Sequence, residues 1–328
     1  QKVSQRKPRS VRTHLKHAVP ITFGFAIAEY AERLGDGIVS LQELNSRLRG
    51  KSSGACGALN GAAALFDDPE AFEADVTLGL NLDPARHSTQ VLPPEPLMRV
   101  FHELQLISGV VANLCHDVRH LMRDEINEVL EIEDAAQVGS STMTHKPPNP
   151  IVYENAESVW KVMVGRYVTV LLDQIKEHQR ELTDSLSSRT YVETIAYLSG
   201  AVKNIARALG RLRANPTAME RNLMIHGDRL VGEKLYLLLA TEAKRTDANQ
   251  LLRDLGRQAR QENKTLETVA MAHPEVRAYL DSLPPERREV FFDPHRYIGI
   301  APQRTTAVAR YWAKRLNINL NDSGKETT

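Results

Sequence analysis

Residues 93–133 read PPEPLMRVFHELQLISGVVANLCHDVRHLMRDEINEVLEIE, and the spacing of their apolar residues decides the fold class. Leucine, valine, isoleucine and phenylalanine recur at intervals of three and four, which is typical of one apolar stripe along a helix. A helix of about 40 residues would be about 60 Å long, at roughly 1.5 Å per residue. Helices longer than about 25 residues indicate a bundle or coiled coil, so we expect a long-helix bundle shared between chains.

Three further long helical patterns flank this stretch, over 20–49, 150–177 and 187–213. The pattern over 150–177 is apolar around more than half of its circumference, which indicates burial against other subunits. We therefore predict an all-α fold whose central long-helix bundle domain covers residues 1–244. Beyond it the helices become short and proline recurs, so we expect a small helical C-terminal domain over 245–320 and a disordered tail over 321–328. Residues 1–13 are interpreted as a connector, a shorter helix is expected at about 69–80, and no strand of useful length is expected.

The composition limits the classes of function. Lys plus Arg is 42 and Asp plus Glu is 41, which gives no reason to expect a nucleic-acid or membrane surface. No apolar run approaches the roughly 20 residues that span a bilayer. The two cysteines, Cys56 and Cys115, form no spaced pair, which disfavours a zinc ribbon or a disulfide framework and favours the cytoplasm. We expect no metal and no cofactor.

Residues 139–150, GSSTMTHKPPNP, separate two of the long helical patterns. Its glycine and serines favour mobility and its prolines stiffen the exit, as suits a loop that closes over a ligand. Other polar clusters also lie at helix ends, where a bundle would place them on a common rim. Together they would supply a base, cations for anions and neutral donors, which suits proton transfer on an anionic substrate. The residues are Ser140 or His14 as base, Lys146, Arg180 and Arg189 as cations, and Thr89, Gln90, Asn149 and Ser185 as donors.

These segments resemble those of a known family. GSSTMTHKPPNP is similar to the GSSxMPxKxNP signature of the fumarase/aspartase superfamily. Within that superfamily, four more segments resemble those of adenylosuccinate lyases and occur in the same order: RTHLKHAVPITFG at 12–24, STQ at 88–90, HQRELTDSLSSR at 178–189 and DPHRYIGIA at 293–301. The resemblance implies a homotetramer whose active sites are shared between chains. It also implies a lyase of purine nucleotide synthesis that releases fumarate by C–N cleavage of a small anionic succinyl-amine or nucleotide.

The resemblance also implies roles for single residues. Ser140 would be the general base that removes a proton next to a carboxylate, and His14 the general acid that protonates the leaving nitrogen. Lys146 and Asn149 would hold the substrate carboxylate. The remaining substrate-binding residues would be Arg12, Thr13, Thr89, Gln90 and Ser141, with Arg180, Ser185 and Arg189 on the nucleotide side. An arginine pair with a hydroxyl suits phosphate geometry.

Departures from the family pattern leave other functions open. The loop has Thr144 in place of the signature's proline and an extra residue before Asn149. One alternative is another substrate within the superfamily, as in a 3-carboxymuconate-cycloisomerase-like enzyme or a C–N lyase of specialised metabolism. Another is a structural relative that assembles without catalysis. The chain begins with Gln1 and without the family's N-terminal domain, so we expect that its natural start is missing.

Two groups of residues have a simpler interpretation beside the functional one. Arg180 and Arg189 would be structural if they paired with carboxylates such as Glu177 or Asp184. His116 and His120 lie four apart, which is the spacing of metal ligands on a helix, but no third ligand is evident in the sequence. The sequence therefore favours an ordinary exposed helix face for this histidine pair.

Overall fold

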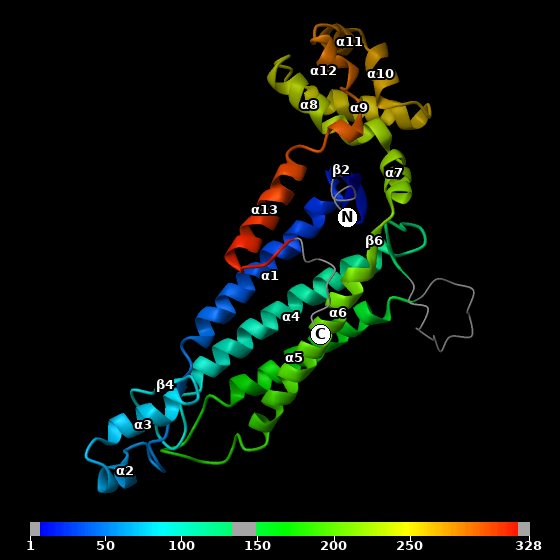
Figure 1. Ribbon diagram of the computed structural model, residues 1–328. Coiled ribbons are helices and arrows are strands. Elements are labelled where there is room, and N and C mark those ends of the chain that lie inside the picture. Colours follow the sequence, from blue (N-terminus) through cyan, green and yellow to red (C-terminus); the bar gives the residue numbers. More distant parts are fainter. Residues whose placement is uncertain (1–6, 133–148, 321–328) are drawn as a thin grey trace, which may run out of the picture. The chain divides into compact units, whose positions relative to one another are not determined.

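The computed structural model describes residues 7–132 and 149–320 (Figure 1). These residues are mostly helical, which confirms the all-α prediction. They form two compact units, each assembled from separate stretches of the chain. Unit 1 comprises the described residues of 1–31, 121–132 and 212–321, and unit 2 those of 32–120, 133–211 and 322–328. The predicted domain boundary at residue 244 stays a prediction.

Unit 2 contains the bundle of long helices. Figure 1 shows α4, α5 and α6 side by side, and the second half of α1 also belongs to this unit. Met98, Phe101 and Val170 are buried between α4 and α5. A Cβ on Gly37 would lie 2.8 Å from Ile107, so α1 and α4 approach closely there. The helix bounds are α1 Phe23–Asn45, α4 Glu95–Leu121, α5 Ile151–Leu172 and α6 Thr190–Arg211.

Shorter elements complete unit 2. The side chain of Asp68 caps α3 by accepting a 2.9 Å hydrogen bond from the Ala71 N–H, and Pro69 occupies the first turn, where its missing N–H costs nothing. The expected helix at 69–80 is thereby confirmed. The elements are β3 Arg49–Gly50, α2 Asn60–Leu65, α3 Pro69–Leu78, β4 Asp83–Pro84 and η2 Ser187–Arg189, and β3 pairs with β4 in parallel.

Unit 1 contains strands that the helical periodicity did not reveal. β1 Pro8–Thr13 and β2 Lys16–Thr22 form an antiparallel hairpin, so the interpretation of residues 1–13 as a connector was wrong. The helix expected to reach Glu133 ends at Leu121, and Val129–Glu131 form strand β5. β5 pairs with β6 Leu212–Ala214, where the helix expected to reach Arg213 has already ended. A pairing partner so far along the chain leaves no local signal.

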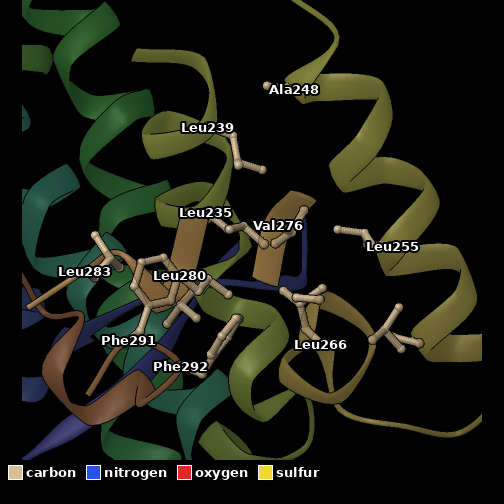
Figure 2. Close-up of a cluster of buried hydrophobic side chains, with 14 residues drawn as sticks. Leu235, Leu239, Ala248, Leu255, Leu266, Val276, Leu280, Leu283, Phe291 and Phe292 are labelled. Carbon is tan, nitrogen blue, oxygen red and sulfur yellow. The ribbon is translucent and has the colours of Figure 1, made fainter. Parts of the chain in front are cut away.

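Short helices after β6 enclose a compact apolar core. Figure 2 shows Leu235, Leu280 and Phe291 directed toward one another, and each of them is at most 1% exposed. Burying one such side chain contributes about 1.5–3 kcal/mol relative to exposure. The elements are α7 Pro216–Met224, η3 Gly227–Val231, α8 Gly232–Thr241, α9 Ala248–Gln261, α10 Leu266–Ala272, α11 Pro274–Asp281, α12 Pro285–Glu289, η4 Pro294–Arg296 and α13 Ala301–Arg315.

Candidate active site

The tip of the β1–β2 hairpin carries the predicted general acid. Thr13 pairs with Lys16, which leaves His14 and Leu15 as a two-residue turn. Their φ angles are +50° and +63°, as in the type I′ turn whose twist matches that of antiparallel strands. Thr13 and His14 are exposed. The turn therefore presents His14 to solvent at the end of a hairpin.

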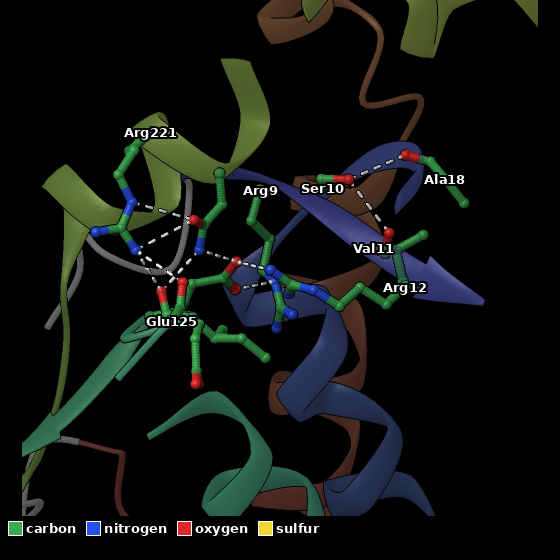
Figure 3. Close-up of polar contacts among 10 residues, drawn as sticks. Arg9, Ser10, Val11, Arg12, Ala18, Glu125 and Arg221 are labelled. Atoms are coloured by element: carbon green, nitrogen blue, oxygen red, sulfur yellow. Dashed lines mark hydrogen bonds and ion pairs between the residues drawn. The ribbon is translucent and has the colours of Figure 1, made fainter. Parts of the chain in front are cut away.

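Arg12 is part of an ion cluster that lies behind this turn (Figure 3). The carboxylate of Glu128 is fully buried, and the Nε atom of Arg9 and the Nη2 atom of Arg12 each lie 2.9 Å from one of its oxygens. Asn222 donates a third contact to the same carboxylate, at 3.0 Å. Such compensation is what a buried charge requires. Arg12 Nη1 is buried without a hydrogen-bond partner among the described residues.

Two histidines beside Arg12 were missed by the sequence analysis. His17 lies opposite Arg12 in the hairpin register, and its ring packs edge-to-face on His226 at 5.2 Å between centroids. Burial lowers the pKa of both histidines, and the charge of Arg12 lowers that of His17 further. The pair is therefore held neutral. Strand register would have indicated the position of His17, but no such signal leads to His226.

The STQ segment in unit 2 rests on the glycine- and serine-rich stretch after α1. Ser53 and Ser88 hydroxyls lie 2.8 Å apart in the interior, and Lys51 Nζ donates to the Gln90 carbonyl at 3.0 Å. Gly57 has φ +81°, and a Cβ there would lie 2.0 Å from the Ser88 carbonyl oxygen. The sequence analysis did not include Lys51 among the site residues.

The STQ segment also contacts the predicted nucleotide-binding segment. The Gln90 N–H donates to the Gln179 carbonyl at 3.2 Å. Gln179 immediately precedes Arg180 in the chain. Thr89 uses its hydroxyl locally, on the Val91 carbonyl at 3.2 Å. The structure therefore brings together two of the segments that the sequence analysis had assigned to one site.

Arg180 is engaged by a carboxylate of its own segment. Its Nη1 atom lies 3.1 Å from Asp184, which also pairs with Lys176. The hydrogen bond from Lys176 lowers the pKa of Asp184, so the carboxylate is ionised. This pairing is the simpler of the two interpretations considered for Arg180. In this structure the two cations, Arg180 and Lys176, therefore share one anionic partner, the carboxylate of Asp184.

The remaining predicted residues are distributed as follows. Asn149 is exposed just before α5, and its carbonyl accepts from the Ile151 N–H at 2.8 Å. Ser185 donates its N–H to the Leu182 carbonyl at 3.1 Å, and Arg189 ends η2. Unit 1 holds Arg12, Thr13 and His14, whereas unit 2 holds Thr89, Gln90, Asn149, Arg180, Ser185 and Arg189. Ser140, Ser141 and Lys146 lie outside the described residues.

The part of the chain that the structure describes offers neither a cluster of three metal ligands nor a membrane-spanning helix. Across 7–132 and 149–320, no group of three or more His, Cys, Asp or Glu side chains is arranged to hold a metal ion. In the same part of the chain, no helix combines the length and apolarity needed to cross a membrane.

Comparison with known proteins gives the family. The family described as "Lyase" matches residues 6–165, and the family described as "Adenylosuccinate lyase C-terminal" matches residues 176–287. The chain belongs to the fumarase/aspartase superfamily. Among curated superfamily relatives, an adenylosuccinate lyase of Pyrococcus horikoshii is 33% identical over 305 residues, which cover 92% of this chain and 66% of that protein. The N-acetyl-S-(2-succino)cysteine lyase of Dickeya dadantii is 28% identical, covering 92% of this chain and 65% of that protein.

Solved structures confirm the superfamily fold. A fumarate lyase from Mesorhizobium sp. BNC1 matches with a TM-score of 0.80 and 25% identity, covering 94% of this chain and 68% of that one. A 3-carboxy-cis,cis-muconate lactonizing enzyme from Pseudomonas putida matches with a TM-score of 0.81 and 24% identity, over 95% and 68% of the two chains. The second match shows the fold alone. The chain spans about two thirds of the length of the curated relatives above.

Proposed function

We propose that this superfamily member is a carbon–nitrogen lyase that releases fumarate by β-elimination from adenylosuccinate or a closely related succinyl-amine. The observation that carries the proposal is the match of residues 176–287 to the adenylosuccinate lyase C-terminal family. That range contains Arg180, Ser185 and Arg189, which are the residue types that bind a phosphate. The 33% identity to an adenylosuccinate lyase supports the same substrate class.

The proposed reaction is a stepwise elimination. Ser140 takes a proton from the carbon next to the substrate carboxylate, and the electron pair spreads into that carboxylate, where Lys146 and Asn149 hold the added charge. The C–N bond then breaks, and His14 donates a proton to the leaving nitrogen, which gives fumarate and the free amine. A serine hydroxyl is a weak base, so its alkoxide requires stabilisation by nearby N–H groups and cations.

The internal ion pairs suggest how the nucleotide side would bind. Arg180 and Lys176 are oriented by Asp184, and a phosphate entering the site would take over their contacts. The buried Nη1 atom of Arg12 would serve as a donor to a second anionic group.

The test is fumarate production from adenylosuccinate, followed by ultraviolet absorbance. Ser140→Ala should lower kcat by roughly 10²–10⁴-fold, because it removes the general base. Ser46→Ala is the matched control, since Ser46 is exposed after α1 and its hydroxyl donates locally to the Glu43 carbonyl. Fumarate release that is unaffected by Ser140→Ala would contradict the mechanism. Absence of turnover on every succinyl adduct tried would instead favour the structural relative.

A second candidate is elimination of a sulfur leaving group. It is favoured by the likeness to the N-acetyl-S-(2-succino)cysteine lyase, at 28% identity over 310 residues. Arg180→Ala separates the two candidates. It should raise KM for a phosphate-bearing substrate by about tenfold or more, because a charged hydrogen bond contributes roughly 1.5–3 kcal/mol. Turnover of N-acetyl-S-(2-succino)cysteine, with a KM indifferent to Arg180→Ala, would favour the sulfur substrate.

We also propose that the protein acts in the cytoplasm as a homotetramer with shared active sites. Support comes from α5 and α6, which expose large apolar side chains in the single chain. They include Val162, Val164, Val168, Leu171, Leu172, Val192, Ile195 and Val202, each at least 39% exposed. Large apolar side chains exposed on two neighbouring helices suggest an interaction site.

A further inference from the structure

Helix α4 carries a histidine pair that the proposed lyase chemistry does not use. His116 and His120 are one turn apart, and their Nε2 atoms lie 3.1 Å apart. The two rings meet edge-on, with centroids 4.6 Å apart. The side chain of His116 is 53% exposed, so the pair is accessible from solvent. At this separation one imidazole N–H donates to the other ring's nitrogen.

The separation also matches that of two ligands on one metal ion. With metal–nitrogen bonds of about 2.0–2.1 Å, two ligands lie about 2.9 Å apart at a right angle and about 3.4 Å apart at the tetrahedral angle. The observed 3.1 Å lies between these limits. Small rotations about the broad histidine χ2 torsions would turn both lone pairs toward a common point.

A carboxylate on the neighbouring helix holds the first histidine. His116 Nδ1 lies 3.4 Å from the Glu157 carboxylate on α5. A carboxylate that accepts from Nδ1–H leaves Nε2 as the free lone pair, as metal-ligating histidines require.

The charge around the pair also permits a cation. Arg119 lies between the two histidines in sequence, and its guanidinium contacts Glu157 at 2.5 Å and Glu154 at 3.6 Å. Two carboxylates thus face one arginine, so the surroundings of the imidazoles are not positive. The sequence analysis favoured an ordinary exposed face because it found no third ligand. The distances place two imidazoles and one carboxylate next to one another.

We propose that His116 and His120 form a two-ligand binding site for a borderline divalent transition-metal ion such as Zn²⁺, Ni²⁺ or Cu²⁺. Water completes the coordination, and Glu157 orients His116 without touching the metal. Imidazole ligands select this class of ion, whereas Mg²⁺ and Ca²⁺ prefer oxygen ligands. Because the ion binds the folded helix, its binding stabilises the protein by mass action.

The experiment uses the full chain, stripped with chelator, and titrates Ni²⁺ or Zn²⁺ alone by calorimetry and thermal unfolding. Wild type should bind and unfold at higher temperature, with the shift reversed by chelator and absent with Mg²⁺. His120→Ala and His116→Ala should each weaken binding at least tenfold, and Glu157→Gln by about tenfold. His102→Ala, which removes another histidine of α4, should leave the affinity unchanged.

A variant with altered histidine spacing tests whether binding depends on the position of the two histidines or only on their number. Asp117→His in the His120→Ala background keeps the number of histidines but moves one around the helix, so it should not restore binding. Equal affinity in wild type and His120→Ala, or restoration by that variant, would overturn the proposal. Circular dichroism identifies any variant that fails to fold. In that case the metal affinity of Glu157→Gln, which keeps both histidines, is the deciding measurement, and an affinity equal to that of wild type would overturn the proposal.

Discussion

Leu15 is a bulky residue in the left-handed backbone region, at φ +63° and 83% exposed. This conformation costs an L-residue roughly 1–2 kcal/mol, and no burial of the side chain offsets it. Leu15→Gly should therefore stabilise the protein by roughly 1 kcal/mol despite the extra chain entropy of glycine. Leu15→Ala is the control, because it trims the side chain and keeps the strained backbone. Chemical denaturation measures both, and a destabilised Leu15→Gly would contradict the type I′ interpretation.

At the same scale, the sequence identified residue types better than their partners. The motif spacing indicated Arg180 as a cation for an anion, and the structure gives it Asp184, four residues away. That partner was within reach of the sequence because a carboxylate so close along the chain is an obvious candidate. The partners of Arg12 were not, since Glu128 lies 116 residues further along the chain. His226 was missed for the same reason.

At the scale of elements, His295 joins η4 to α7. Its Nδ1 atom lies 2.7 Å from Asp293 and its Nε2 atom 2.9 Å from Glu220. Burial lowers the pKa of His295, but the hydrogen bonds to the two carboxylates outweigh burial and raise it above 6.5. Burial would raise the pKa of Asp293, but its hydrogen bonds with His295 lower it below 3.8.

These directions fix the pH dependence of the contact. The contribution of His295 is complete below pH 6.5 and is lost as pH rises through its raised pKa, while that of Asp293 is lost only as pH falls through its lowered pKa. Urea midpoints of wild type and His295→Gln should therefore differ more below pH 6.5 than in alkaline solution, where the protonated imidazole is lost. A difference that does not change with pH would contradict this account. His87→Gln, at an exposed position, serves as the control.

The elements themselves were predictable where their signal is local. The three-and-four spacing in α4 follows from the helix's own geometry, so its existence could be read from the sequence. Its end could not, because Ile126 and Val129 continue the spacing although β5 pairs with residues 212–214. β1 was hidden by its composition, since buried Arg9 and Ser10 resemble a solvated segment. Their burial depends on Glu128 and on the Ala18 carbonyl in β2.

At the scale of the whole molecule, the exposed apolar side chains of α5 and α6 predict self-association. Val168 is 51% exposed in the single chain, so an aspartate there would cost the folded chain little. In a tetramer whose bundle helices pack together, the same charge would be buried without a partner. Val168→Asp should therefore convert tetramers to smaller species in analytical ultracentrifugation. Leu65→Asp, 79% exposed on α2, should leave the tetramer intact, and an unchanged mass for Val168→Asp would rule out this face.

The Glu128 cluster also sets the order of events during synthesis. Arg9 and Arg12 leave the ribosome before Glu128, but Asn222 follows Glu128 by 94 residues, or roughly 5–20 s of translation. All the helices of unit 2 have been made before Asn222, because α6 ends at Arg211. Unit 2 can therefore fold on the nascent chain while the carboxylate of Glu128 is still in water. Unit 1 therefore folds last. In a chain that stalls before Asn222, the bundle of unit 2 can be folded while the Glu128 cluster beside the β1–β2 hairpin is still incomplete.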